Sequence, residues 1–209
     1  MNHPILTPLC LTAPPFDNIV VFDLETTGLS PRRDEIIQVG AVRIVRGHIQ
    51  ETDSFFSYVK PAGPIPAFIT SYTGITDADV AHAPRAGRVL PLFSRFCGDG
   101  LLIAHNGLSF DIPFIRESCA RHGLATRTVN FIDSMHLSWN VWGRKAVSHG
   151  LSAVQERLQV TSGGLRRHDA RGDVHVTAGC VCRMVDRLVR EREGVAVKLY
   201  SRPFPQMAT

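Results

Sequence analysis

Apolar residues fall along the chain in short continuous runs that are separated by turn-forming residues. Residues 19–24 and 36–45 are dense in Val, Ile and Phe, as expected of strands that are buried on both faces. Residues 48–60 predict a third strand, and the runs at 101–104 and 129–133 predict two more. Short connections join the first three strands, which favours antiparallel pairing, whereas longer helical crossovers favour parallel pairing of the last two.

Apolar residues also recur at helical spacing between and after these strands. The stretch 89–97 carries them at i, i+3, i+4 and i+7, and residues 109–122 predict a second helix. Ser152 and Gln155 form a capping-box pair at the start of a third helix, and a long last helix is expected over 172–193. Strands followed by alternating helices and strands predict an α/β fold, with a five-stranded mixed sheet flanked by helices.

Length and composition fit one globular domain. The chain has 209 residues, of which 44% are hydrophobic and 20% are charged. It has no apolar run of the roughly 20 residues that cross a bilayer, and its first residues contain four prolines but no basic region typical of a signal peptide. We therefore expect a cytoplasmic protein without membrane contact, with a flexible N-terminal arm over 1–16, one folded domain over 17–193 and a short C-terminal tail over 194–209.

The net charge of +4 comes entirely from the C-terminal part of the chain. Residues 1–162 have 14 basic and 14 acidic side chains, whereas residues 163–209 have 9 basic and 5 acidic ones. Such an excess attracts polyanions, although a solvated helix face would have the same composition. Trp139 and Trp142 add two aromatic rings, which could stack on bases or pack within their own segment.

Two acidic residues lie at the end of the first apolar strand. Asp23 and Glu25 are two positions apart, so both carboxylates leave the same face of the strand. Like charges on an apolar surface are costly unless a cation lies between them, and hard oxygen ligands of this kind suit Mg²⁺ or Mn²⁺. The alternative is a pair of solvated acids at an exposed strand end.

Two further acids and a histidine follow later strand–loop junctions. Asp111 opens the helix after a short strand, Asp173 opens the last long helix, and His168 precedes that helix. Each of them alone could be a capping or surface residue. Together with Asp23 and Glu25 they supply four carboxylates and one imidazole, the set of groups used in two-metal hydrolysis of a phosphodiester. The imidazole would accept the proton of the attacking water.

Three sequence strings carry a resemblance to a known family. FDLETTG at 22–28, AHNGLSFDIPFI at 104–115 and RHDARGD at 167–173 resemble the motifs of the DEDDh 3′–5′ exonucleases, the family that includes the proofreading epsilon subunit of bacterial DNA polymerase III. The resemblance covers roughly residues 17–192. It implies a ribonuclease H-like fold, two divalent cations (Mg²⁺ or Mn²⁺) and release of nucleoside 5′-monophosphates from single-stranded DNA. It also implies four metal ligands and one general base: Asp23, Glu25, Asp111 and Asp173, and His168.

The substrate contacts and partners are less constrained by this resemblance. It suggests that Thr26 holds the terminal nucleotide, that Leu29 packs on its base and that Asn106 lines the path of the strand. DNA is favoured as the substrate. An exoribonuclease acting on RNA ends and an inactive nucleic-acid-binding module are the alternatives. A polymerase or sliding-clamp partner stays open, although the short tail does not support firm attachment, and so does a homodimer.

Overall fold

The computed structural model describes residues 4–10, 16–145, 147–161, 164, 169–191 and 195–208. Within these residues the strands are β1 (Ile5–Pro8), β2 (Asn18–Thr26), β3 (Ile36–Val45), β4 (His48–Tyr58), β5 (Leu101–Ala104), β6 (Thr126–Asp133) and β7 (Ala196–Pro205). The helices are α1 (Ala67–Thr73), α2 (Asp77–Val80), α3 (Ala86–Cys97), α4 (Asp111–Arg121), α5 (Ser134–Trp142), α6 (Leu151–Leu158) and α7 (Ala170–Glu191).

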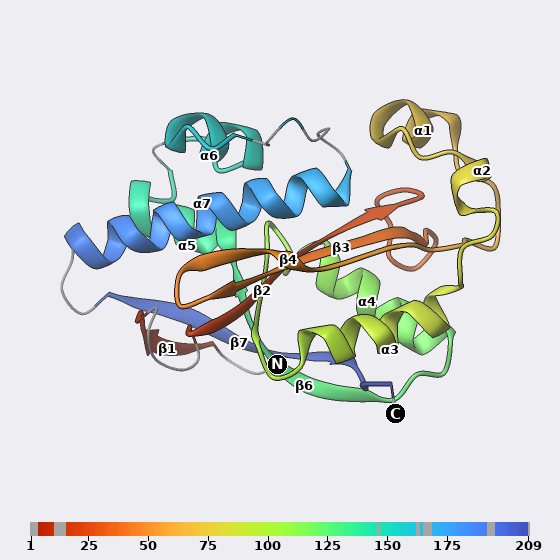
Figure 1. Cartoon of the computed structure of the whole chain (residues 1–209), viewed down its shortest axis with the longest axis horizontal. Helices are drawn as coiled ribbons and strands as arrows, with labels where there is room; N and C mark the ends of the chain where they lie inside the picture. The colour runs from red at the N-terminus through yellow and green to blue at the C-terminus, as the bar shows by residue number, and fades with distance from the viewer. Residues whose placement is uncertain are drawn as a thin grey trace.

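The strands form one mixed sheet in the order β1-β7-β6-β5-β2-β3-β4. β3 pairs antiparallel with both β2 and β4, and β5 pairs parallel with both β2 and β6, as the connection lengths predicted. The carboxyl ends of β2, β5 and β6 therefore lie at one edge of the sheet, the usual place for ligands in open α/β folds. In Figure 1, α7 lies across the sheet with its first turn toward this edge.

The sheet has seven strands among the described residues, and the prediction of five was therefore wrong. The two additional strands, β1 and β7, come from segments that the sequence analysis placed in the arm and the tail. β7 pairs antiparallel with β6, and its Val197 and Phe204 are buried. Pro203 and Pro205 conceal the strand pattern, because proline is confined to edges and ends of sheets. Both prolines lie beyond residues 196–199, the part of β7 that pairs with β1.

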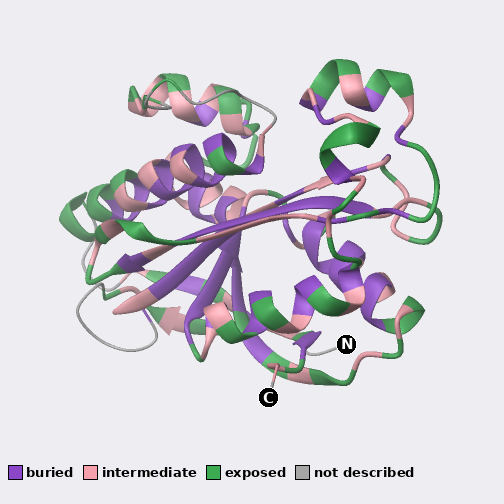
Figure 2. Cartoon of the chain, turned by 45° about the vertical axis from the view of Figure 1, so that its right-hand side comes forward, coloured by how far each residue is buried: buried purple, intermediate pink, exposed green. Residues whose placement is uncertain are grey.

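Helices cover both faces of the sheet (Figure 1). α3 and α4 pack on one face, where the rings of Phe22, Phe93 and Phe204 contact one another. α5 and α7 pack on the other face, where Val21 and Val181 belong to a second apolar core, and α6 packs on α7. Successive residues of β2 point alternately into the two cores, which explains its continuous apolar run. Figure 2 shows the strands as a buried layer between helices with exposed outer surfaces.

α7 is the longest described helix, with 22 residues, and a buried apolar stripe runs along it. The stripe fixes the rotation of the helix on the sheet, and with it the direction of Asp173 in the first turn. No helix in the described part of the chain is long and apolar enough to cross a membrane.

Candidate metal-binding site

Three carboxylates meet where β2 ends and α7 begins. Asp23 and Glu25 lie two residues apart on β2, and Asp173 lies in the first turn of α7. One oxygen atom of each carboxylate lies within 4.8 Å of those of the other two, the only such group of acidic, His or Cys side chains among the described residues. The structure thus brings together three of the four acids that the sequence indicated as metal ligands.

The start of α7 is held against β3 by a buried hydrogen bond. Gln38 Oε1 accepts a hydrogen bond from the backbone N–H of Ala170 at 2.7 Å, and Gln38 has no exposed surface. Gln38 also pairs with Glu25 in the β2–β3 ladder. β3 therefore sets the position of α7 relative to the acids of β2. The sequence analysis missed Gln38, although a single amide within the apolar run IIQVGAV was a usable signal.

Gly40 permits this close approach of α7 to β3. A Cβ atom at position 40 would lie 2.6 Å from the carbonyl oxygen of Ala170 and 2.8 Å from its carbonyl carbon. We expect Gly40→Ala to push the first turn of α7 outward, to lower the free energy of unfolding by about 1–3 kcal/mol and to reduce activity by displacing Asp173. Thermal melting and activity measurements would show both effects. Gly63→Ala is the matched control, because an added Cβ there meets no atom within 4 Å. Equal melting temperatures for the two variants would contradict this expectation.

Asp111, the first residue of α4, is 2% exposed. Its Oδ1 is buried without a hydrogen-bond partner among the described residues. Burial, reinforced by the charge of Asp133, raises the pKa of Asp111 to about 8. A buried acid in this position is costly to ionise unless a cation accompanies it.

Asp133, at the end of β6, shapes the loop that leads to Asp111. Its carboxylate accepts hydrogen bonds from the backbone N–H groups of Asn106 and Leu108, both at 3.0 Å, and of Met135 at 2.9 Å. Asn106 has a φ of 60°, in the left-handed region that Asn adopts more readily than most residues. A side chain from the neighbouring strand therefore fixes the β5–α4 loop.

The other residues that the sequence indicated differ in accessibility. Thr26 is buried and donates a hydrogen bond from Oγ1 to the carbonyl oxygen of Gly28 at 2.5 Å, which holds the turn after β2. Leu29 is 82% exposed on that turn, and Asn106 is exposed at the start of the β5–α4 loop. His168 lies outside the described residues.

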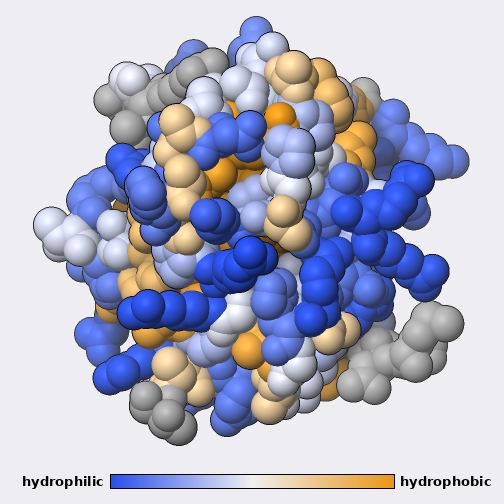
Figure 3. Space-filling view, turned by 90° about the vertical axis from the view of Figure 1, so that its right-hand side faces the viewer, coloured by the Kyte–Doolittle hydropathy of each residue, from blue (hydrophilic) through white to orange (hydrophobic). Residues whose placement is uncertain are grey.

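Exposed hydrophobic side chains also lie on α1, which packs on β3 through Ile69 and Ile37. Phe68 and Tyr72 of α1 are 65% and 57% exposed. Figure 3 looks onto the end of the molecule that carries α1 and α2, where hydrophilic residues predominate and hydrophobic ones show between them.

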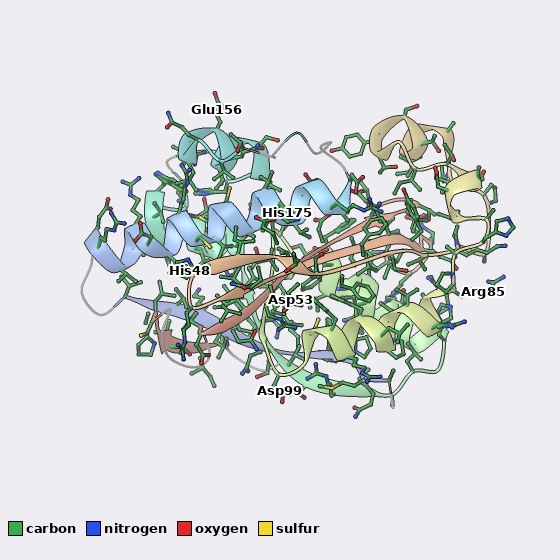
Figure 4. All side chains as sticks on the ribbon, in the orientation of Figure 1. His48, Asp53, Arg85, Asp99, Glu156 and His175 are labelled. Carbon is green, nitrogen blue, oxygen red and sulfur yellow. The ribbon has the colours of Figure 1, made fainter. Side chains whose placement is uncertain are left out.

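A separate hollow of about 710 Å³ lies between α7 and the β3–β4 turn. His48, Glu51 and His175 are among its lining residues, and Figure 4 shows His175 along α7 and His48 near that turn. His175 Nδ1 lies 3.2 Å from the Glu51 carboxylate, so these two groups are paired. The hollow has no described group of three metal-binding side chains within 4.8 Å of one another, and the carboxylate cluster remains the candidate metal site.

The carboxylate cluster fits a hard divalent cation. Its donors are all carboxylate oxygens, the ligand type that Mg²⁺ and Mn²⁺ prefer. Like charges gathered within 4.8 Å, beside a buried acid with an unsatisfied oxygen, are stabilised when positive charge lies between them. The arrangement can therefore bind cations and present them to an anionic ligand.

Comparison with known proteins gave a family match over most of the chain. The RNase_T family model, described as an exonuclease, matches residues 20–181. Two curated proteins described as DNA polymerase III PolC-type, from Streptococcus pyogenes serotype M18 (strain MGAS8232) and serotype M5 (strain Manfredo), are each 36% identical over 176 residues. These matches cover 84% of this chain and 12% of each relative, so the chain spans only a small part of their length.

Solved structures share the fold at low sequence identity. A structure described as exonuclease X in complex with 5′ overhanging duplex DNA has a TM-score of 0.65 and 24% identity, covering 85% of this chain and 96% of that chain. The nuclease domain of 3′hExo, described as a DEDDh family member bound to rAMP, has a TM-score of 0.68 and 20% identity, covering 87% and 96%. The predicted ribonuclease H-like architecture is thereby confirmed.

Proposed function

This chain belongs to the RNase_T exonuclease family and has the DEDDh motifs, and on that premise we propose that it removes nucleotides from the 3′ end of a nucleic-acid strand. Hydrolysis of each terminal phosphodiester would release a nucleoside 5′-monophosphate. The observation that carries the proposal is the approach of the Asp23, Glu25 and Asp173 oxygens to within 4.8 Å, beside the buried Asp111. Two-metal phosphodiester hydrolysis requires such a cluster.

Four carboxylates would hold two divalent cations, Mg²⁺ or Mn²⁺: those of Asp23, Glu25, Asp111 and Asp173. When bound, such ions neutralise phosphate charge and help to activate the attacking water. The contribution of the protein is to fix the carboxylates before the substrate binds. The strand orients Asp23 and Glu25, the contact of α7 with β3 positions Asp173, and the first turn of α4 holds the buried Asp111. Ligands fixed in this way need no reorganisation during the reaction.

We assign the role of general base to His168, which precedes α7 in the sequence. A neutral imidazole accepts the proton of a water molecule near physiological pH. Leu29 would pack on the terminal base, and its exposure on the turn after β2 supports this role. Asn106 would line the path of the strand. Thr26 would hold the turn that contacts the terminal nucleotide, because its hydroxyl is bonded to the backbone of that turn.

DNA is the substrate that we favour. The curated relatives are described as DNA polymerases, and one of the solved structures is described as a complex with duplex DNA. RNA is the second candidate, because another solved structure holds rAMP. An inactive nucleic-acid-binding module is the third candidate, and the complete set of four carboxylates argues against it. A polymerase is the partner that these relatives favour, ahead of a sliding clamp or a second copy of this chain.

The test uses the purified chain with 5′-labelled single-stranded DNA and RNA of matched sequence, in Mg²⁺, in Mn²⁺ and in EDTA. We expect stepwise shortening from the 3′ end that is absent in EDTA and in the Asp23→Ala variant. The faster of the two ladders identifies the preferred sugar. If both strands are bound but stay intact under every metal condition, the exonuclease function is wrong and the binding module replaces it.

A further inference from the structure

An aromatic cluster lies where α5 meets β7, beyond the carboxylate site. The ring of His136 stacks on Trp139, with ring centroids 4.2 Å apart and an interplanar angle of 34°. Tyr200 Oη lies 3.0 Å from His136 Nδ1. Tyr200 is buried, whereas His136 and Trp139 are half-buried. Because His136 and Trp139 belong to a helix and Tyr200 to a strand, the three rings are held in place. We call these three rings the aromatic floor.

Three basic side chains surround this aromatic floor. The guanidinium carbon of Arg144 lies 4.8 Å from the ring centroid of Trp139, and that of Arg202 lies 4.8 Å from the ring centroid of Tyr200. Lys198 is exposed two residues before Tyr200, on the same face of β7. In the described part of the chain, none of the three cations has a carboxylate as an ion-pair partner.

Two of these cations, Lys198 and Arg144, act on the charge of the same side chain, His136. Burial lowers the pKa of His136, the charge of Asp133 opposes this shift, and the charges of Lys198 and Arg144 lower the pKa further. The carboxylate of Asp133 is meanwhile occupied by three backbone N–H groups. Protein surfaces that bind single-stranded nucleic acid combine positive charge, which attracts the phosphates, with aromatic rings, on which the bases stack.

This surface lies next to the β5–α4 loop, which carries Asn106 and leads to Asp111. Moving outward from the carboxylate site, the strands follow one another as β2, β5, β6 and β7. Asp133 links the two regions, because it is hydrogen-bonded to the backbone of Asn106 and its charge acts on both Asp111 and His136. β7, which carries Lys198 and Arg202, lies outside residues 20–181, the part of the chain that the family model matches.

We propose that the accessory strip, a surface formed by Trp139, Arg144, Lys198 and Arg202, binds the single-stranded segment upstream of the 3′-terminal nucleotide. The inference rests on the exonuclease function proposed above. The three cations contact phosphates of the strand, and Trp139 and the planar guanidinium groups stack on bases. The strip holds a long strand between successive cleavages and takes no part in the chemistry.

The test compares two triple variants that remove the same charge. The strip variant is Arg144→Ala/Lys198→Ala/Arg202→Ala. The control removes three exposed arginines at α3, Arg85→Ala/Arg88→Ala/Arg95→Ala, and Arg85 is labelled at the start of that helix in Figure 4. Fluorescence anisotropy in EDTA gives the Kd of a single strand of about 20 nucleotides, long enough to reach beyond the terminal site, at several salt concentrations. Hydrolysis of a dinucleotide in Mg²⁺ gives the activity at the carboxylate site alone.

We expect the Kd of the strip variant to rise about 10-fold near physiological salt, and the slope of log Kd against log salt to fall by about 2, or about 0.7 for each lost phosphate contact. Hydrolysis of the dinucleotide should not change.

Lys198→Glu tests the strip if the triple variant fails to fold, because Lys198 is exposed, and it should weaken binding in the same way. Equal Kd values for strip and control variants, or an unchanged Kd for Lys198→Glu, would overturn the strip alone. A wild-type chain that shortens neither the long strand nor the dinucleotide in Mg²⁺ would instead overturn the exonuclease function.

Discussion

Replacing Asp173 by Asn is expected to lower kcat by about 10³-fold or more, which corresponds to about 4 kcal/mol of lost transition-state stabilisation. Asp173 is 6% exposed, and one of its oxygens lies within 4.8 Å of those of Asp23 and Glu25. An amide of the same shape carries no charge and is a poorer ligand for a hard divalent cation. Because the substitution removes one of several neighbouring like charges, the variant should still fold.

Asp186→Asn provides the matched control, on the same helix. Asp186 is exposed, and its carboxylate lies 2.7 Å from the guanidinium group of Arg190, which is one turn beyond Asp186 on α7. Single-turnover rates on a 5′-labelled strand, measured over a range of Mg²⁺ concentrations, would separate loss of cation binding from loss of chemistry. An Asp173→Asn variant that keeps more than about a tenth of the wild-type rate at saturating Mg²⁺, less than 1.4 kcal/mol of effect, would remove Asp173 from the metal site.

The acids of β2 could be placed from the sequence because their geometry is local. A strand alternates its side chains with a period of two, so Asp23 and Glu25 share a face whatever the rest of the fold does. The start of α7 is similarly local, since the apolar stripe from Val174 to Leu188 predicts both the helix and its buried side. The family resemblance depended on such short segments, and the order of the three motifs in the sequence was enough to identify it.

The contacts that bring these segments together could not be placed in the same way. Gln38 and Ala170 are 132 residues apart, and their hydrogen bond depends on how α7 packs on β3. Gly40 has its effect at the same contact. Periodicity specifies which face of a helix is buried, but not the position along the sheet at which it packs. The hydrogen bonds from the β5–α4 loop to the Asp133 carboxylate are also non-local. They join the end of β6 to the loop that follows the neighbouring strand β5.

The strands at the β1 end of the sheet were missed for a different reason. β7 is held by the ladder with β6 and by its buried apolar residues, and its sequence carries two prolines and two basic residues. Strand propensity is a weak guide in such a segment, because pairing with neighbours decides the outcome. The same basic residues, Lys198 and Arg202, are exposed or half-buried once the strand has formed, which is why the accessory strip becomes visible only in the folded chain.

Asp111→Asn is expected to have opposite effects on activity and on the stability of the metal-free protein. Burial raises the pKa of Asp111 from its ordinary value of 3.8 to about 8. Below about pH 4 the carboxyl group is protonated in both the folded and the unfolded chain, and its contribution to stability is fully present. As the pH rises toward 8, the unfolded chain loses this proton while the folded chain keeps it. The free energy of unfolding therefore falls with rising pH, by roughly 3–5 kcal/mol at the upper end.

Asn cannot ionise, so the variant escapes this loss. In EDTA at pH 8 we expect the Tm of Asp111→Asn to exceed that of the wild type by about 5 °C or more, with little difference near pH 4.5, and we expect activity to be lost. Divalent cations should raise the Tm of the wild type more than that of the variant, which keeps only the three carboxylates of Asp23, Glu25 and Asp173. Asp99→Asn is the control, because its side chain is 98% exposed. Parallel pH profiles of Tm for wild type and Asp111→Asn would show that Asp111 ionises freely. Divergence of the two profiles toward pH 8 would show instead that burial of the Asp111 carboxyl group weakens the metal-free fold as the pH rises.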